Sequence, residues 1–234
     1  MQDPMWIRGL LGVHIAAGTV SFVMAPAALA TAKGGKAHRR WGEVYFWAMA
    51  VVAATALVLA AYRPILFLAL VAVFSFYSAF AAYRVLGQKG TVRNKTQGSA
   101  RGEAQIEAMD WAAAVITFAA SFALAACGLL RPAMVQGLGI PAIIFGALGM
   151  MLGGSDLWRF THPSQEKMFW WYQHLQGMMG SYIAAWTAFL VVTVGQFVHA
   201  WWLWIVPTAI GVPAIALTTA YYKKKFLPKV KVAA

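Results

Sequence analysis

Five histidines carry most of the chemistry that this sequence could support, because ionisable side chains are costly inside long apolar segments. His14 lies within the first apolar run, and His174 lies near the start of the sixth. His38 follows a short basic turn, His162 lies in a polar connection, and His199 precedes the last run. By depth they divide into an outer pair, His14 and His199, and an inner group of three. Because a b-type haem takes two axial imidazoles from different helices, this division would suit a membrane protein with haem b.

The elements that must position these histidines are membrane spans. The chain of 234 residues is 61% hydrophobic and 11% charged, whereas about a quarter of the residues in soluble domains are charged. A transmembrane helix needs about 20 apolar residues. The sequence therefore predicts an all-α integral membrane bundle, one domain over 1–234, with seven transmembrane helices at 6–30, 42–62, 64–85, 107–130, 134–157, 168–194 and 201–222. We expect the first run to be a retained helix, because it is too long for a typical signal peptide.

Positive charge is concentrated in alternate connections between these runs. All of the 19 Lys and Arg residues except Arg8, Arg63 and Arg131 lie in three connections and in the tail after 222. The positive-inside rule then places the N-terminus outside and the C-terminus in the cytoplasm. The net charge of +12 predicts an anionic inner leaflet of the lipid bilayer as partner. Nucleic acid is not expected, because the cations lie in short loops between apolar runs.

One predicted helix has a face without side chains. Gly146, Gly149 and Gly153 share this face, and Asp156 follows at the next turn. Small residues at such spacing favour close helix contact in lipid. The alternative is that a flat ligand, a porphyrin or a quinone, lies against the bare backbone there. Asp110, at the edge of the preceding apolar run, is a second carboxylate at membrane depth.

The inner histidines also permit a metal site. Together with Asp110 or Asp156 they offer nitrogen and oxygen ligands to zinc, with an open position for water, as in a metal-dependent hydrolase. The spacing does not favour this interpretation, because the sequence contains no HxxxH or HExxH pair. A single cysteine, Cys127, excludes an intramolecular disulfide and a CxxC site.

Four stretches of the chain resemble a family of bacterial polytopic membrane proteins that share a predicted membrane domain of unknown function. They are HIAAG at 14–18, KGGKAHRRWGEVYFWAM at 33–49, HLQGMMGSYIAAWTAFLVV at 174–192 and WLWIVPTAIGVPAI at 202–215. The family is distantly similar to helical-bundle b-type cytochromes, a likeness of fold. The resemblance covers nearly the whole chain and implies a bacterial cytoplasmic membrane. It also implies that His14, His38 and His174 stand in the family's motifs, whereas His162 and His199 fall outside them.

These observations predict a redox or electron-transfer protein that binds b-type haem or a quinone. His38 and His174 are the predicted inner ligands, His14 marks an outer site, and the glycine face makes room for the cofactor. A non-catalytic subunit or assembly factor of a larger membrane complex is the main alternative, with partner subunits packed on its small-residue faces. A small-solute transporter and the metal-dependent hydrolase are further alternatives.

Overall fold

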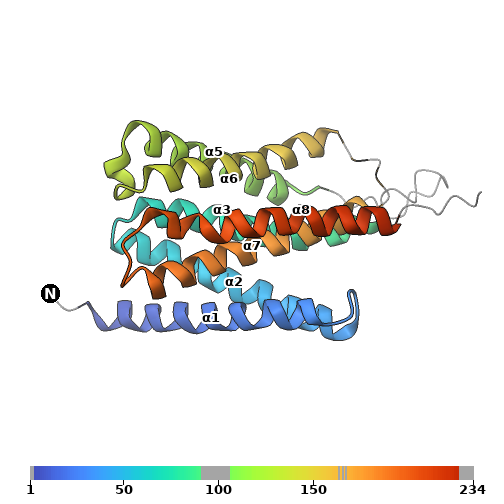
Figure 1. Cartoon of the computed structure of the whole chain (residues 1–234), viewed down its shortest axis with the longest axis horizontal. Helices are drawn as coiled ribbons and strands as arrows, with labels where there is room; N and C mark the ends of the chain where they lie inside the picture. The colour runs from blue at the N-terminus through green and yellow to red at the C-terminus, as the bar shows by residue number, and fades with distance from the viewer. Residues whose placement is uncertain (1–2, 91–105, 163, 165, 167, 227–234) are drawn as a thin grey trace, which may run out of the picture.

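The computed structural model describes residues 3–90, 106–162, 164, 166 and 168–226, and these residues form a bundle of long helices (Figure 1). Short 3-10 helices continue or connect the α-helices: η1 (Val85–Gly90), η2 (Pro132–Val135) and η3 (Trp201–Trp204). The described ranges contain no β-strand. The α-helices are α1 (Met5–Ala30), α2 (Lys36–Tyr62), α3 (Leu66–Arg84), α5 (Ala108–Leu130), α6 (Gly139–Thr161), α7 (Phe169–Val194) and α8 (Val206–Phe226).

Seven of these segments are long and apolar enough to cross a membrane, which confirms the predicted all-α architecture and the number of spans. The helices extend further than the apolar runs at one end of the bundle. α2 begins at Lys36 rather than 42, and α8 continues to Phe226 rather than 222. Long basic side chains keep their charged ends in water while their stems cover apolar surface, so a helix can continue through them.

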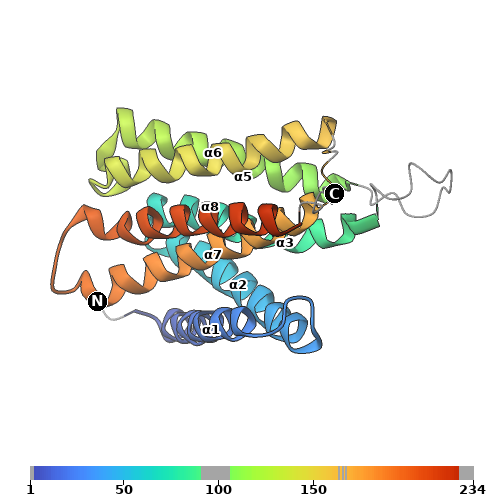
Figure 2. The ribbon, with the colours of Figure 1, turned by 45° about the vertical axis from the view of Figure 1, so that its right-hand side comes forward.

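The helices form layers. α1 pairs with α2, α5 pairs with α6, and α3, α7 and α8 lie between these two hairpins (Figures 1 and 2). α3 contacts helices on both sides, and α8 contacts mainly α7. α3 therefore occupies the centre of the bundle, and residues on its different faces can belong to different sites.

Two buried clusters hold the layers together. Phe67 and Phe74 of α3 pack with Phe145 of α6 and with residues of α5 and η2. Ring contacts extend this cluster, because Trp204 meets Phe67 edge-on with ring centroids 4.8 Å apart. The second cluster joins α1 and α2 around Tyr45 and has partly buried residues of α3 and α7 against it.

Alternating helix directions bring the basic segments to the same end of the bundle. The first residue of α2, the last of α3 and the last turns of α6 and α8 all lie there (Figure 1). Arg63 lies at the opposite end, where it forms an ion pair with Asp3. The predicted segregation of charge between the two ends is thus a property of the folded chain.

Candidate functional site

His38 and His174 lie side by side at the basic end of the bundle. Their ring centroids are 6.3 Å apart and the ring planes are inclined at 77°. His38 belongs to the first turn of α2, and His174 lies just inside α7. Two histidines separated by more than half of the chain are therefore neighbours, on different helices and at the same depth.

A backbone carbonyl holds each ring in the same way. His38 Nδ1 donates a hydrogen bond to the carbonyl oxygen of Ala28, and His174 Nδ1 donates one to that of Ala82, each at 2.9 Å. Because a carbonyl oxygen only accepts, both Nδ1 atoms carry hydrogen. In the neutral rings Nε2 then has the lone pair, which is the arrangement usual in metal-ligating histidines.

A close approach of two helices places His174 against α3. A Cβ atom on Gly177 would lie 2.7 Å from the Ser78 carbonyl oxygen and from Ala82 Cβ. Only glycine allows this approach, and His174 lies one turn before it on the same side of α7. The absence of a side chain at Gly177 thus brings the His174 ring to the end of α3.

The short turn between α1 and α2 places His38. Gly34 has a φ of 76°, a conformation that glycine adopts at little cost, and the reversed chain carries His38 back to Ala28. Lys33 in the same turn donates a hydrogen bond to the carbonyl oxygen of Leu29. Partial burial of Lys33 disfavours its charged form and lowers its pKa.

Asp110 takes part in an ion-pair network at the start of α5. Arg84 donates from Nε to Asp110 Oδ1 and from Nη2 to Asp110 Oδ2, both at 2.8 Å. Asp110 also accepts from the backbone N–H of Glu107 in a capping box, and Glu107 forms an ion pair with Arg84 at 3.2 Å. Asp110 therefore connects the first turn of α5 to Arg84 at the end of α3, and its oxygens are engaged in structural contacts.

Asp156 forms a second network, between α6 and α3. The hydroxyl of Tyr77 donates to Asp156 Oδ2 at 2.6 Å, and Arg159 Nη2 donates to Asp156 Oδ1 at 2.8 Å. Tyr77 is 4% exposed and Asp156 is 7% exposed. Arg159 also lies over the rings of Phe160 and Phe169. The carboxylate is thus buried with one tyrosine and one arginine as partners.

This second network borders a large cavity. The cavity has a volume of about 1050 Å³ and is lined by α1, α2, α3, α6, α7, α8 and residues next to η2 and η3. Its lining is mainly apolar, with Tyr77, Asp156, Arg159, Gln173 and Gln176 as a polar group toward the basic end. The cavity thus has a group of polar side chains toward the basic end, and His14, Arg63 and Gln136 line it elsewhere. A mainly apolar space with a few polar side chains is typical of sites for small ligands.

The remaining histidines have other environments. His14 lines the same cavity, and its Nδ1 is 2.9 Å from Thr55 Oγ1. The Thr55 hydroxyl donates to a backbone carbonyl of its own helix, so it accepts from His14. His162 is exposed and stacks on Trp158 with ring centroids 3.9 Å apart. His199 is exposed in the segment before η3.

The glycine face of α6 lies against α5. A Cβ atom on Gly146 would lie 2.6 Å from the Ser121 carbonyl oxygen, and one on Gly149 would overlap the Ser121 hydroxyl. Gly153 approaches the backbone of Ala114 and Phe118 in the same way. The structure thus places this predicted ligand face in a helix–helix interface, which corresponds to the close-contact alternative for small residues.

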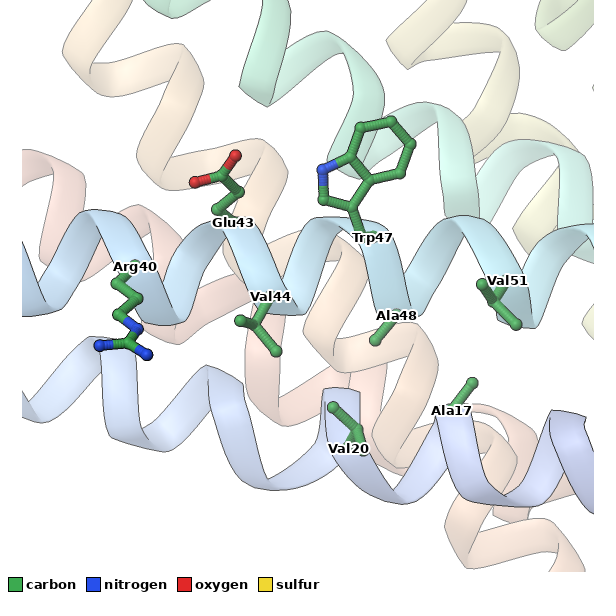
Figure 3. Close-up of a pocket in the computed structure, with 8 residues that line it drawn as sticks. All are labelled: Ala17, Val20, Arg40, Glu43, Val44, Trp47, Ala48 and Val51. Carbon is green, nitrogen blue, oxygen red and sulfur yellow. The ribbon is translucent and has the colours of Figure 1, made fainter.

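A shallower groove of about 540 Å³ runs along the outside of α1 and α2. Figure 3 shows Arg40, Val44 and Ala48 on the side of α2 that faces α1, whereas Glu43 and Trp47 point away from α1. The charged side chains therefore do not converge on one point, and this groove offers no set of polar groups that would orient a ligand.

Tyr77, Gln173 and Gln176 are site residues that sequence reasoning missed. Tyr77 and Asp156 are far apart in the chain, and neither has a local motif around it. For Gln173 and Gln176 the signal was their position next to His174, in the otherwise apolar start of α7.

The predicted three-histidine metal set does not assemble. Within the described residues, no group of three or more His, Cys, Asp and Glu side chains could hold a metal ion. Of the three inner histidines, the fold brings His38 and His174 together. Comparisons of the chain with models of protein families, with curated proteins and with solved structures find no match.

Proposed function

We propose that this protein transfers electrons in a bacterial cytoplasmic membrane and that His38 and His174 are the axial ligands of a b-type haem. The N-terminus is outside, and the basic end of the bundle, with this pair, faces the cytoplasm and its anionic leaflet. The histidine pair is the observation that carries the proposal. Two half-buried imidazoles from different helices meet at one end of the bundle, and each donates from Nδ1 to a backbone carbonyl, as metal-ligating histidines usually do.

The two rings are close enough to share one bound group, because their centroids are 6.3 Å apart. His38 and His174 would hold a haem from two different helices. A haem brings its own four equatorial nitrogens, so two side chains from the protein suffice. The chemistry that it supplies when bound is reversible one-electron transfer.

Hydrogen bonds to backbone carbonyls and a close helix contact hold His38 and His174 in position. The carbonyl oxygens of Ala28 and Ala82 fix the orientation and tautomer of the two rings, and such hydrogen bonds raise the basicity of the ligating nitrogen. Gly177 fixes the distance of α7 from α3. His14 is not part of this pair. It is hydrogen-bonded to Thr55 and lines the cavity away from the basic end.

The test is an absorbance spectrum of protein purified in mild detergent from haem-supplemented cells, before and after reduction with dithionite. We expect a Soret band that sharpens on reduction. His174→Ala and His38→Ala should each lose at least about nine-tenths of this band, because one axial ligand is removed. The matched control is His162→Ala, a histidine at the same end that stacks on Trp158 in an exposed position.

Two results would contradict the proposal. One is a featureless spectrum from a folded wild-type preparation. The other is a band of full intensity in both His38→Ala and His174→Ala. Wild-type, His38→Ala and His174→Ala proteins are compared at equal helix content by circular dichroism, so that loss of cofactor is separated from loss of fold.

A further inference from the structure

We infer that the large cavity described above binds an isoprenoid quinone, with the quinone ring at Tyr77, Asp156, Gln173 and Gln176 and the isoprenoid tail along the apolar walls. The inference rests on the proposed electron-transfer function for its physiological meaning. The binding site itself is argued from the cavity alone.

The size and lining of the cavity suit a long apolar chain. Its volume of about 1050 Å³ is at the upper end of the range of about 300–1,000 Å³ that is usual for small-molecule sites. Leu148, Leu152, Val191 and Ile215 are among its apolar walls, and Trp204 lies toward the end opposite Asp156. An apolar chain in this space gains burial in proportion to the area that it covers.

The polar end has balanced charge. Asp156 is paired with Arg159, so the carboxylate and the guanidinium together carry no net charge. Tyr77 donates to the same carboxylate, and the other polar side chains that line this end, among them the amides of Gln173 and Gln176, are neutral. A neutral head group is therefore favoured here, whereas a phosphate would lie against the Asp156 carboxylate and be repelled.

Hydrogen bonding at this end matches a quinone in both of its oxidation states. A quinone presents two carbonyl oxygens, which accept from amide donors such as the two glutamines, while the single O–H of Tyr77 donates to Asp156. A hydroquinone presents two hydroxyl groups, which donate to a carboxylate such as Asp156. Gln176 is held in place by Thr219 of α8, whose hydroxyl accepts from Gln176 Nε2 at 3.3 Å. The site thus offers donors and an acceptor to the same ring.

The polar end adjoins the histidine pair. Ala82 lines the cavity, and its carbonyl oxygen accepts the hydrogen bond from His174. Gln173, the residue before His174, also lines the cavity. A quinone ring bound here would share a wall with the proposed haem ligand, which is the arrangement needed for electron exchange between the two.

A cavity-filling variant tests the inference without touching the polar cluster. Gly180 lines the cavity and a Cβ atom there would have nothing within 4 Å, so Gly180→Leu fills the space without a clash at Cβ. Gly12→Leu is the matched control, because Gly12 also has nothing within 4 Å and lies outside the cavity lining. Both substitutions replace a helical glycine and are tolerated or favoured by helix propensity.

The measurement is the affinity of purified full-length protein for ubiquinone-2 and menaquinone-2, followed by quenching of tryptophan fluorescence. We expect Gly180→Leu to bind the preferred quinone at least about tenfold more weakly than the wild type, and Gly12→Leu to bind it within about twofold of the wild type. Equal affinity in the wild type and both variants would overturn the inference. Displacement of the bound quinone by an equimolar amount of palmitoyl-oleoyl phosphatidylglycerol would also overturn it and assign the cavity to phospholipid.

Failure of this inference and failure of the proposed function give different results. Specific quinone binding by a preparation without a Soret band would uphold the quinone site and contradict the haem assignment. A Soret band that depends on His174, in a protein whose quinone affinity is the same in Gly180→Leu, would uphold the haem and overturn the quinone site.

Discussion

Arg84 and Asp110 join two helices, whereas Arg159 and Asp156 lie one turn apart on the same helix. Both pairs lie at the basic end of the bundle, and both carboxylates are buried. The ion pair of Arg84 with Asp110 connects the end of α3 to the capping box of α5. Neither residue lines the large cavity or the groove described above. The Asp156 carboxylate of the Arg159 pair accepts a hydrogen bond from Tyr77 of α3, and the pair lines a large cavity. The same residue types therefore have a structural role in one place and form a candidate binding site in the other.

The difference between the two pairs comes from their neighbours. Arg84 and Asp110 are engaged with the capping box of α5, and neither residue lines the cavity. Asp156 lies seven residues after Gly149 on the same face of α6, at a level where α3, α7 and α8 leave room beside it. A buried ionic group is therefore evidence of a binding site only when the packing around it leaves space for a ligand.

Breaking the Arg84–Asp110 pair should have the largest effect on stability. Asp110→Ala removes a two-point ion pair and leaves Arg84 without its main partner, so the free energy of unfolding should fall by about 3 kcal/mol. The measurement is thermal or denaturant unfolding in detergent. Glu166→Ala is the control, because its ion pair with Lys223 is exposed and should contribute under about 1 kcal/mol.

Asp110→Ala also tests the comparison between the two pairs. Folded Asp110→Ala protein should bind ubiquinone-2 or menaquinone-2 as the wild type does, because Asp110 lies outside the cavity lining. A large loss of quinone affinity with normal stability would reverse the roles that we assign to Asp110 and Asp156.

Gly149 of α6, in the interface with α5, and Gly180 of α7, at the cavity, should respond differently to an added methyl group. Gly149→Ala places a Cβ atom on the Ser121 hydroxyl and should destabilise the fold by about 2 kcal/mol through overpacking. Gly180→Ala meets nothing within 4 Å and should leave stability unchanged or raise it by up to about 1 kcal/mol. Unfolding midpoints of the two variants measure this difference, and equal midpoints would mean that the α5–α6 interface is not tightly packed.

A loss of stability smaller than that of Gly149→Ala is expected when a tyrosine hydroxyl is removed, either at the cavity or in the core. Tyr77→Phe removes one hydrogen bond to a charged acceptor and should cost about 1.5 kcal/mol of unfolding free energy. Tyr45→Phe removes the buried hydrogen bond to Ser181, 2.6 Å long, which lies outside the cavity lining, and should cost about 1 kcal/mol. Only Tyr77→Phe should also weaken quinone binding, by roughly threefold to tenfold. Similar quinone affinities in the two variants would place the quinone ring away from Tyr77.

Part of the candidate site was accessible from the sequence. Depth and residue type predicted an inner group of His38, His162 and His174, and the family resemblance set His162 apart. The structure places the ring centroids of His38 and His174 6.3 Å apart. The glycine face was predicted with two interpretations, and its contacts with α5 correspond to the helix-packing one. The structural role of Asp110 and the network of Tyr77 with Asp156 were not predicted, because both depend on a partner helix far away in the chain.

The sequence by itself determined the number of spans, their approximate bounds and the end of the bundle at which the cations gather. These properties depend on length, apolar content and the position of charges along a single segment, and each segment satisfies its own backbone hydrogen bonds within its helix. Tertiary structure alone decided which faces of the helices meet. Gly149 and Asp156 lie two turns apart on one face of α6, but Gly149 packs against Ser121 of α5 whereas Asp156 borders the cavity. Side-chain packing between helices sets which neighbour each position meets.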